Sequence, residues 1–330
     1  MNETDTSLVE PKHNLSVMLS RIRNWPELGA ILAFLTIFIF FSLFAPRFFG
    51  LRNLTGTFTV VSELGIMTIG VAFLMIAGEF DLSVSGVYAT TGFLFVTLGN
   101  RLNSVLALAI ALAVAACIGL LNGTLTLRAR VPSFITTLGM MMFLRGMMIV
   151  ATGGQTVVYE GDEIVATLLS KYIAHGFRPS HIWFIALVVF FSYLLTGTRY
   201  GNWVFATGGN KEVARAMGVN VERVKLINFA ISSMMAGLSG CIVINRFGVA
   251  NASFGTGMEL ETIAACVIGG TFLTGGYGTI IGVFCGAFLM GSIRTGLVMI
   301  GAPAYWYQAF VGAMLVIAAA IHIKVRKGVM

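Results

Sequence analysis

Charged side chains inside apolar stretches are the first candidates for chemistry in this sequence. Glu63, Arg145 and Arg294 each lie within or near the end of such a stretch. A charge at the centre of a bilayer costs at least about 2.5 kcal/mol, so it normally faces the protein interior or a wet cavity. A carboxylate or guanidinium there can bind solute hydroxyls, so Glu63 and Arg145 are candidates for a solute pathway. A structural ion pair is the alternative for Glu63, and we expect Arg294 to extend to the membrane interface.

Two carboxylates and a hydroxyl stand close together in the segment Gly78–Gly86. Because Glu79 and Asp81 would be costly in hydrocarbon, we expect a cytoplasmic turn between the second and third membrane spans. Asp81 and Ser83 are both suitable N-cap residues, and negative charge favours a helix N-terminus. We therefore expect them to cap the helix that follows.

The polar segment 198–225 predicts a short capped helix between two spans. Asn210 can cap the helix Lys211–Met217 at its start, and Gly218 stands at the C-terminal cap position. A short helix flanked by positive charge suits docking into a groove of a partner protein; an ordinary solvated loop is the alternative. Val213 and Met217, at i and i+4, would form an apolar ridge. The residues expected at this contact are Gly208, Gly209, Asn210, Glu212, Val213, Ala214, Arg215, Met217 and Gly218.

Motifs for catalysis are absent from the sequence. There is no G-x-x-x-x-G-K-[ST] to hold nucleotide phosphates, no H-E-x-x-H, no G-x-S-x-G and no metal-spaced cluster of His and Cys. The cysteines lie in apolar stretches without C-x-x-C spacing, as small buried hydrophobic residues do. We therefore expect no catalytic residue, no metal ligand and no cofactor on this chain.

Composition determines the class of protein. The 330 residues are 57% apolar and 11% charged, with a mean hydropathy of +0.89, whereas soluble domains are about 25% charged. These values exclude a water-soluble enzyme, a disordered protein and a secreted disulfide scaffold. The net charge of +7 is typical of Lys and Arg retained on the cytoplasmic side of a membrane protein, so we expect no nucleic-acid partner.

The apolar stretches predict an all-α membrane protein with about ten transmembrane helices, because one span needs about 20 apolar residues. Between Glu261 and Arg294 lie 32 uncharged residues, too many for one pass. Thr274–Gly278 offers a break there, and a re-entrant hairpin is the alternative to two full spans. The expected spans are 28–45, 58–77, 84–99, 104–127, 133–151, 181–197, 225–245, 258–273, 278–299 and 304–323.

Orientation follows from the basic residues of the short loops. With ten spans and a cytoplasmic N-terminus, Arg128, Arg130 and most of the basic residues of 198–225 fall on the cytoplasmic side, whereas loop 152–180 carries several acidic residues. We expect a multi-pass protein of the inner (plasma) membrane with both termini in the cytoplasm. The expected organisation is a cytoplasmic or interfacial segment 1–27, a transmembrane domain 28–323 that contains the loop 198–225, and a cytoplasmic tail 324–330.

Four motifs, in order along the chain, resemble those of one transporter family. Gly208–Asn220 is similar to G-G-N-x-x-A-A-x-x-x-G-[IV]-N of ribose-type sugar ABC transporter permeases. Gly78–Gly86 resembles the G-G-I-D-L-S-V-G of that family. Leu121–Gly123 with Val131–Gly139 resembles N-G…P-x-F-I-x-T-L-G, and Glu259–Gly276 resembles E-L-[DE]-x-I-A-A-x-V-I-G-G-T-x-L-x-G-G.

The departures from the family pattern are local. Glu79 replaces the usual second glycine before Asp81, and Ser85-Gly86 lengthens that motif by one residue. Arg294-Thr295 stands where the family often has two asparagines. These differences leave the family resemblance intact and the sugar undefined, so pentoses, hexoses and small polyols all stay open.

The resemblance implies the membrane permease subunit of a bacterial importer, all-α with internally repeated helical halves. It implies a separate cytoplasmic ATPase that holds ATP and Mg²⁺, a periplasmic or lipid-anchored sugar-binding protein, and a second permease subunit, identical or paralogous. At least one of Glu63, Asn122, Phe134 and Arg145 is then expected to line a central cavity between the two permease subunits.

Two other classes of membrane protein are weighed against this one. An ion-coupled secondary transporter should carry paired ionisable residues near the midplane on broken helices; Glu63 is one candidate, without an evident acidic partner. A membrane-embedded enzyme would need a nucleophile, a metal set or an acid–base pair, and the sequence offers none. The ATP-driven importer is therefore the favoured hypothesis.

Overall fold

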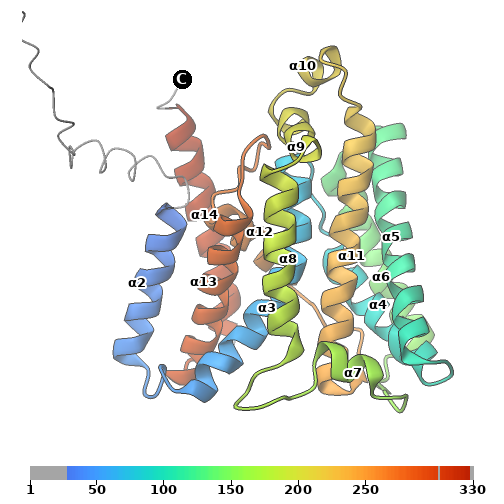
Figure 1. Ribbon diagram of the computed structural model, residues 1–330, viewed down its shortest axis with the longest axis vertical. Helices are drawn as coiled ribbons and strands as arrows, with labels where there is room; N and C mark the ends of the chain where they lie inside the picture. Colours follow the sequence, from blue (N-terminus) through green and yellow to red (C-terminus); the bar gives the residue numbers. More distant parts are fainter. Residues whose placement is uncertain (1–27, 304, 328–330) are drawn as a thin grey trace, which may run out of the picture.

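The computed structural model describes residues 28–303 and 305–327, and most of its helices run side by side along the long axis (Figure 1). Segment 1–27, expected to be interfacial, lies outside the described residues. Two short strands, β1 (Val157–Val158) and β2 (Val249–Ala250), pair antiparallel. The helices are α2 (Leu28–Phe44), α3 (Leu51–Ile76), α4 (Val84–Gly99), α5 (Ser104–Arg128), α6 (Ser133–Thr152), α7 (Ile164–Leu169), α8 (Pro179–Thr196), α9 (Arg199–Gly209), α10 (Lys211–Ala216), α11 (Val221–Phe247), α12 (Met258–Ile268), α13 (Ile280–Met299) and α14 (Tyr305–Lys327).

Within the described residues, 6 helices are long and apolar enough to cross a membrane, namely α3, α5, α6, α8, α11 and α13. Shorter apolar helices lie within α2, α4 and α14. The 11 residues of α12 extend for about 16 Å, against a hydrocarbon thickness of about 30 Å. An all-α membrane protein is confirmed, whereas the expected span 258–273 is corrected to a half-length helix that ends at Ile268. The predicted break follows, as the non-helical segment 269–279.

Side-chain caps and glycines determine where several helices begin and end. The side chain of Asn103 accepts the backbone N–H of Val105 at the start of α5, and Thr279 does the same for Gly282 at the start of α13. Each satisfies one of the free N–H groups of a first helical turn. At the other end of α11, Gly248 adopts φ +69°, a conformation that favours glycine.

The core of the bundle is built around α3 and α11. The most apolar window of α3 is 94% buried, and α11 packs against α3, α4 and α5. A Cβ on Gly240 of α11 would lie 2.2 Å from the carbonyl oxygen of Tyr88 in α4, and one on Gly119 of α5 would lie 2.4 Å from that of Phe229. Small residues therefore allow these helix backbones to touch, as in other membrane bundles.

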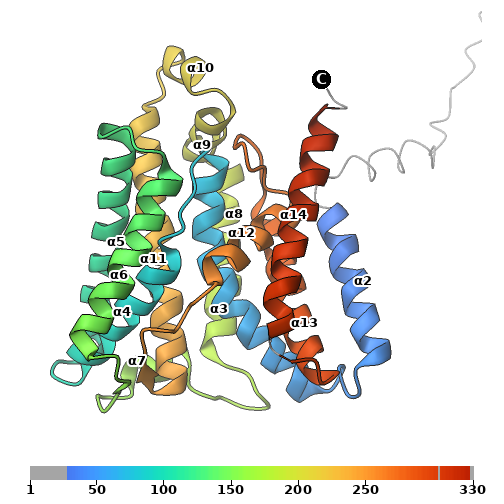
Figure 2. The same ribbon diagram turned by 180° about the vertical axis from the view of Figure 1, so that it is seen from behind.

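Two helices begin inside the bundle. The non-helical segment 77–83 leads from α3 into α4, and the segment 251–257 leads into α12, which lies near the middle of the bundle (Figure 2). The two helix starts touch, because a Cβ on Gly255 would lie 2.8 Å from Cδ1 of Tyr88 and 3.2 Å from the carbonyl oxygen of Ser85. We call this place, residues 81–88 with 253–261, the half-helix junction.

Candidate functional site

The short helix expected in the loop 198–225 is present as α10, at one end of the molecule (Figure 1). The side-chain oxygen of Asn210 accepts the backbone N–H groups of Glu212 and Val213, both at 3.1 Å. A six-residue helix has few internal hydrogen bonds, so this cap contributes a large share of its stability. The predicted N-cap is confirmed.

The C-terminal end of α10 is a Schellman cap. Gly218 has φ +82°, and its N–H donates to the carbonyl of Arg215 at 2.9 Å. The N–H of Val219 donates to the carbonyl of Ala214 at 3.0 Å. Because a left-handed conformation favours glycine at this position, the predicted role of Gly218 as the helix stop is confirmed.

The side chains of α10 divide between an exposed face and a face packed on the subunit. Val213 and Met217 are 57% and 80% exposed on the described part of the chain, so most of the apolar ridge is open to a partner. Ala214 is only 3% exposed, because α10 packs against α9 and α11. Ala214 therefore holds α10 onto its own subunit, and its expected part in the contact with a partner stays a prediction.

The charges of α10 are already partly paired. Arg215 lies 3.2 Å from Glu212 and 3.7 Å from Glu222, and all three side chains are exposed. Exposed pairs of this kind are worth about 0–1 kcal/mol, so they orient side chains rather than stabilise the fold. Lys211 is exposed at the start of the helix.

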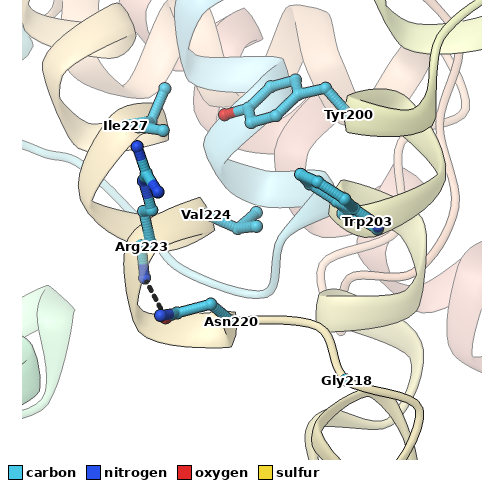
Figure 3. Close-up of a pocket in the computed structure, with 7 residues that line it drawn as sticks. All are labelled: Tyr200, Trp203, Gly218, Asn220, Arg223, Val224 and Ile227. Carbon is cyan, nitrogen blue, oxygen red and sulfur yellow. Dashed lines mark hydrogen bonds between the residues drawn. The ribbon is translucent and has the colours of Figure 1, made fainter.

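A pocket of about 330 Å³ opens beside the C-terminal cap of α10, between α9 and the start of α11 (Figure 3). The rings of Tyr200 and Trp203 form one side, and Val224 and Arg223 of α11 form the other (Figure 3). Trp203 is 45% exposed, whereas the Tyr200 hydroxyl donates to Asn228 Oδ1 at 2.6 Å. The pocket thus combines an aromatic wall with a cationic rim.

The helix α9 was missed at the sequence level, where its residues were assigned to a loop. The one sequence signal for it is Thr198, whose hydroxyl oxygen accepts the N–H of Gly201 at 3.3 Å. The pair Gly208-Gly209 ends this helix, although glycine is a poor helix former.

These two glycines lie where α9 contacts the non-helical segments 77–83 and 269–279. The N–H of Gly276 donates to the carbonyl of Ile76, the last residue of α3, at 2.8 Å. A Cβ on Gly208 would lie 1.8 Å from that same carbonyl oxygen, and one on Gly275 would lie 2.7 Å from the Cα of Gly78. We call the contact the glycine junction; its residues are Gly78, Gly208, Gly209, Gly275 and Gly276.

The segment 78–83 joins α3 to α4, as the sequence predicts, but only its first residues lie near the surface. Its start lies beside the α9 end, where Glu79 accepts a hydrogen bond from Lys225 of α11 at 2.5 Å. It then enters the bundle, where Asp81 and Ser83 are fully buried. The N–H of Leu82 donates to the hydroxyl of Thr137 in α6 at 3.0 Å. Side chains of neighbouring helices thus satisfy backbone groups that no helix ladder satisfies.

The expected capping of α4 by Asp81 and Ser83 is wrong. No side-chain cap is formed at the start of α4. Instead, Asp81 accepts the Ser83 hydroxyl at 2.5 Å and the Ser232 hydroxyl of α11 at 2.9 Å. Asn122 of α5 donates to the Ser83 oxygen at 2.8 Å. The Asp81 carboxylate therefore ties the segment 78–83 to α11, and the Ser83 hydroxyl ties it to α5.

Glu63 lies in a buried ion pair. Its carboxylate accepts two hydrogen bonds from the guanidinium of Arg246 in α11, at 2.5 and 2.8 Å. The Glu63 side chain is 7% exposed and that of Arg246 is 21% exposed. Of the two roles left open, the structural ion pair is the one that these contacts favour. Arg246 is outside the set of residues singled out from the sequence.

The other expected pathway residues, Asn122, Phe134 and Arg145, do not gather at one place in the described chain. Asn122 is buried inside the subunit, whereas Phe134 of α6 is 55% exposed. Arg145 of α6 donates to the Thr256 hydroxyl at 2.5 Å, within the half-helix junction. Arg294 lies 3.8 Å from Glu261 of α12 and its side chain is 48% exposed, so its extension to the membrane interface stays a prediction. No group of three or more His, Cys, Asp and Glu that could hold a metal ion occurs among the described residues.

The comparisons with known proteins identify the class of molecule. Residues 53–319 match the family described as "Branched-chain amino acid transport system / permease component". The ribose import permease protein of Escherichia coli (strain K12) is 35% identical over 299 residues, which are 89% of this chain and 92% of that protein.

Two further relatives are import permeases for autoinducer 2. The permease of Yersinia pseudotuberculosis serotype O:1b (strain IP 31758) is 34% identical over 302 residues, 90% of this chain and 85% of that protein. The permease of Photorhabdus luminescens is 32% identical over 302 residues, 90% of each. The ribose-type motifs, the apolar helical bundle and these matches agree, so the chain belongs to the family of ribose-type ABC importer permeases.

Proposed function

We propose that this protein is the membrane-spanning subunit of an ATP-driven importer of a monosaccharide or a related small polyol. The observation that carries the proposal is α10, a capped helix that exposes Val213 and Met217 and sits on α9 next to the glycine junction. A cytoplasmic ATPase subunit would receive this ridge in a groove. The pocket between Trp203 and Arg223 would receive an apolar side chain of the same partner, with an acidic group at its rim.

The glycine junction would transmit a movement of the ATPase subunit from α10 and α9 into the membrane-spanning bundle. Its backbones touch without side chains between them, so a shift of α9 displaces the segments 77–83 and 269–279 directly. These segments flank α4 and the half-length helix α12. The partner would bind ATP and Mg²⁺ and hydrolyse the nucleotide, because this sequence has no nucleotide-binding motif.

The assembly proposed here has a defined orientation and set of partners. The α10 end faces the cytoplasm of a bacterial cell with an inner membrane, because the basic residues Arg128, Arg130 and Arg199 lie at that end, and both termini are cytoplasmic. A periplasmic or lipid-anchored binding protein delivers the solute to the opposite end. A second permease subunit completes a central pathway, with Arg145 on its wall.

The class of solute rests on the relatives rather than on the family description. That description names branched-chain amino acids, whereas the relatives that match most of the chain are named for ribose and autoinducer 2. The more similar sequences favour a polyhydroxylated solute.

The test is transport by the purified complex. The protein is reconstituted in liposomes with the ATPase and the binding protein encoded beside it, and uptake of radiolabelled D-ribose is measured. We expect uptake that requires ATP and continues after ionophores have collapsed the proton and sodium gradients. Uptake that requires a gradient and ignores ATP would instead support the ion-coupled secondary transporter, for which a buried carboxylate such as Asp81 on a non-helical segment is the supporting observation.

A further inference from the structure

Two charged side chains at the half-helix junction carry polar atoms with no partner in the described chain. Arg145 donates from Nη1 to Thr256, but its Nε and Nη2 are buried without a hydrogen bond. Oε2 of Glu259, in the first turn of α12, is likewise buried and unpaired. Buried polar groups are normally satisfied, so these three atoms require an explanation.

The junction brings the two residues to the same short loop from different directions. Arg145 comes from α6 and reaches Thr256, whose hydroxyl in turn donates to the carbonyl of Ser253 at 2.7 Å. Glu259 follows three residues after Thr256, on the helix that this loop leads into. Among the described residues no ion pair joins Arg145 to Glu259, so each of the two side chains keeps polar atoms that a ligand group can satisfy.

The donor and acceptor set restricts the chemistry of the ligand. A guanidinium with free Nε–H and Nη2–H presents a planar pair of donors, which two adjacent hydroxyl oxygens can accept. A carboxylate oxygen accepts a hydroxyl proton but repels an anion. An uncharged molecule with vicinal hydroxyls satisfies both groups, whereas a phosphate or carboxylate satisfies only the arginine.

We propose that Arg145, Thr256 and Glu259 form a binding subsite for the vicinal hydroxyls of the transported polyol. Arg145 Nε and Nη2 donate to two neighbouring hydroxyl oxygens, and Glu259 Oε2 accepts a hydroxyl proton. This inference rests on the proposed transport function and adds the residues and the ligand chemistry. The subsite lies at the start of α4 and α12, so a movement of the segments 77–83 and 269–279 at the glycine junction would also displace the subsite.

The experiment measures protection of a cysteine placed in the subsite. Thr256→Cys is introduced into the full transporter complex, and its rate of modification by a charged thiol reagent is measured with and without D-ribose, after subtraction of the reaction of the wild-type chain. Ser253→Cys, in the same loop but without a contact to Arg145, is the matched control. L-valine serves as the probe for an amino-acid ligand.

We expect D-ribose to slow modification of Thr256→Cys and to leave Ser253→Cys unchanged, with no effect of L-valine. Adding Arg145→Ala or Glu259→Gln should raise the D-ribose concentration for half-protection by about tenfold, as loss of a charged hydrogen bond does. Arg145→Lys should be nearly as weak as Arg145→Ala, because an ammonium lacks the paired planar donors.

Each opposite result has a distinct meaning. Protection that survives both Arg145→Ala and Glu259→Gln overturns the subsite, and so does absence of protection in a complex that imports D-ribose. Protection by L-valine overturns the polyol chemistry. Modification that responds to anionic lipid but not to D-ribose assigns Arg145 to a headgroup and also overturns the subsite. A complex without ATP-driven D-ribose uptake or protection fails the proposed function itself.

Discussion

Among single residues, the neighbours of a charged side chain in the bundle decide whether it forms an ion pair or keeps polar atoms without a partner. Glu63 pairs with Arg246 of α11, whereas Arg145 donates a hydrogen bond to the Thr256 hydroxyl and forms no ion pair among the described residues. The sequence shows that both charges lie in apolar stretches, but it does not show the partner. Arg246 is 183 residues away from Glu63, so no local spacing identifies the pair.

The first prediction concerns that pair. Glu63→Gln leaves the Arg246 guanidinium half-paired in a buried site, which should cost at least about 2 kcal/mol of stability. Thermal unfolding in detergent measures the loss. Glu163→Gln, which breaks the exposed pair with Lys171, is the matched control and should change the melting temperature little.

A second variant separates stability from solute binding at Glu63. Replacing the pair by apolar residues, Glu63→Leu with Arg246→Met, should recover most of the stability, because no charge then stays buried alone. Uptake should recover as well. A stable double variant without transport would show that Glu63 contacts the solute, against the structural role.

The second prediction concerns pH at the end opposite α10. Asp162 accepts hydrogen bonds from the hydroxyl and the N–H of Ser104, at the start of α5, and these bonds hold the pKa of its carboxyl below the ordinary 3.8. Because the folded pKa is depressed, the stabilisation is fully present above the ordinary value and is lost as pH falls through the folded one.

Amide exchange of residues 155–163, corrected for intrinsic rates, should therefore change little between about pH 5 and pH 8 and rise below the ordinary pKa. Asp162→Asn should show fast exchange already at about pH 5, because an amide does not replace the ionised acceptor. Unchanged protection in Asp162→Asn would mean that Ser104 is held by other contacts.

At the scale of elements, helices with strong caps were predictable and interrupted ones were not. Asn210 and Gly218 define α10 from sequence alone. In contrast, α9 ends in two glycines, which in the sequence predict a loop. Glycine is needed there because the backbones of Ile76 and Gly276 approach closely, and both residues are distant in sequence. The half length of α12 was also not predictable. The 32 uncharged residues between Glu261 and Arg294 are compatible with two full spans and equally with a half-length helix followed by one span.

The third prediction tests the glycine junction with two adjacent substitutions. Gly208→Ala would place a Cβ 1.8 Å from the carbonyl oxygen of Ile76, so α9 must move away from α3 at a cost of about 1–3 kcal/mol. Uptake should fall steeply at matched abundance in the membrane. In Gly209→Ala the nearest atom is 4.0 Å from the new Cβ, and uptake should stay close to wild type.

Equal loss of uptake in the two variants would mean that helix propensity or local backbone freedom matters at this position, not the contact with α3. Equal tolerance would mean that the close approach does not carry the coupling. Only a difference between adjacent glycines supports a mechanical role for the junction.

At the scale of the whole molecule, the fold class and the family followed from composition and from motifs in order along the chain. The arrangement of those motifs did not. Three of the four motifs, Gly78–Gly86, Gly208–Asn220 and Glu259–Gly276, meet through backbone contacts around α9, α4 and α12. Such contacts join residues distant in sequence and leave no periodic signal, so only the folded chain shows that docking helix and helix breaks form one connected unit.

The central claim is that α10 receives the motion of an ATPase, and the most direct measurement is solute uptake and ATP hydrolysis by the complex with Val213→Asp or Met217→Asp. Both side chains are exposed, so either change should leave folding within about ±0.5 kcal/mol. Leu168→Asp, on the equally short α7 at the opposite end and 55% exposed, is the control for an added surface charge. We expect the α10 variants to lose both ATPase co-purification and uptake, and the control to co-purify normally. Wild-type uptake from Val213→Asp and Met217→Asp at matched membrane abundance would contradict the central claim.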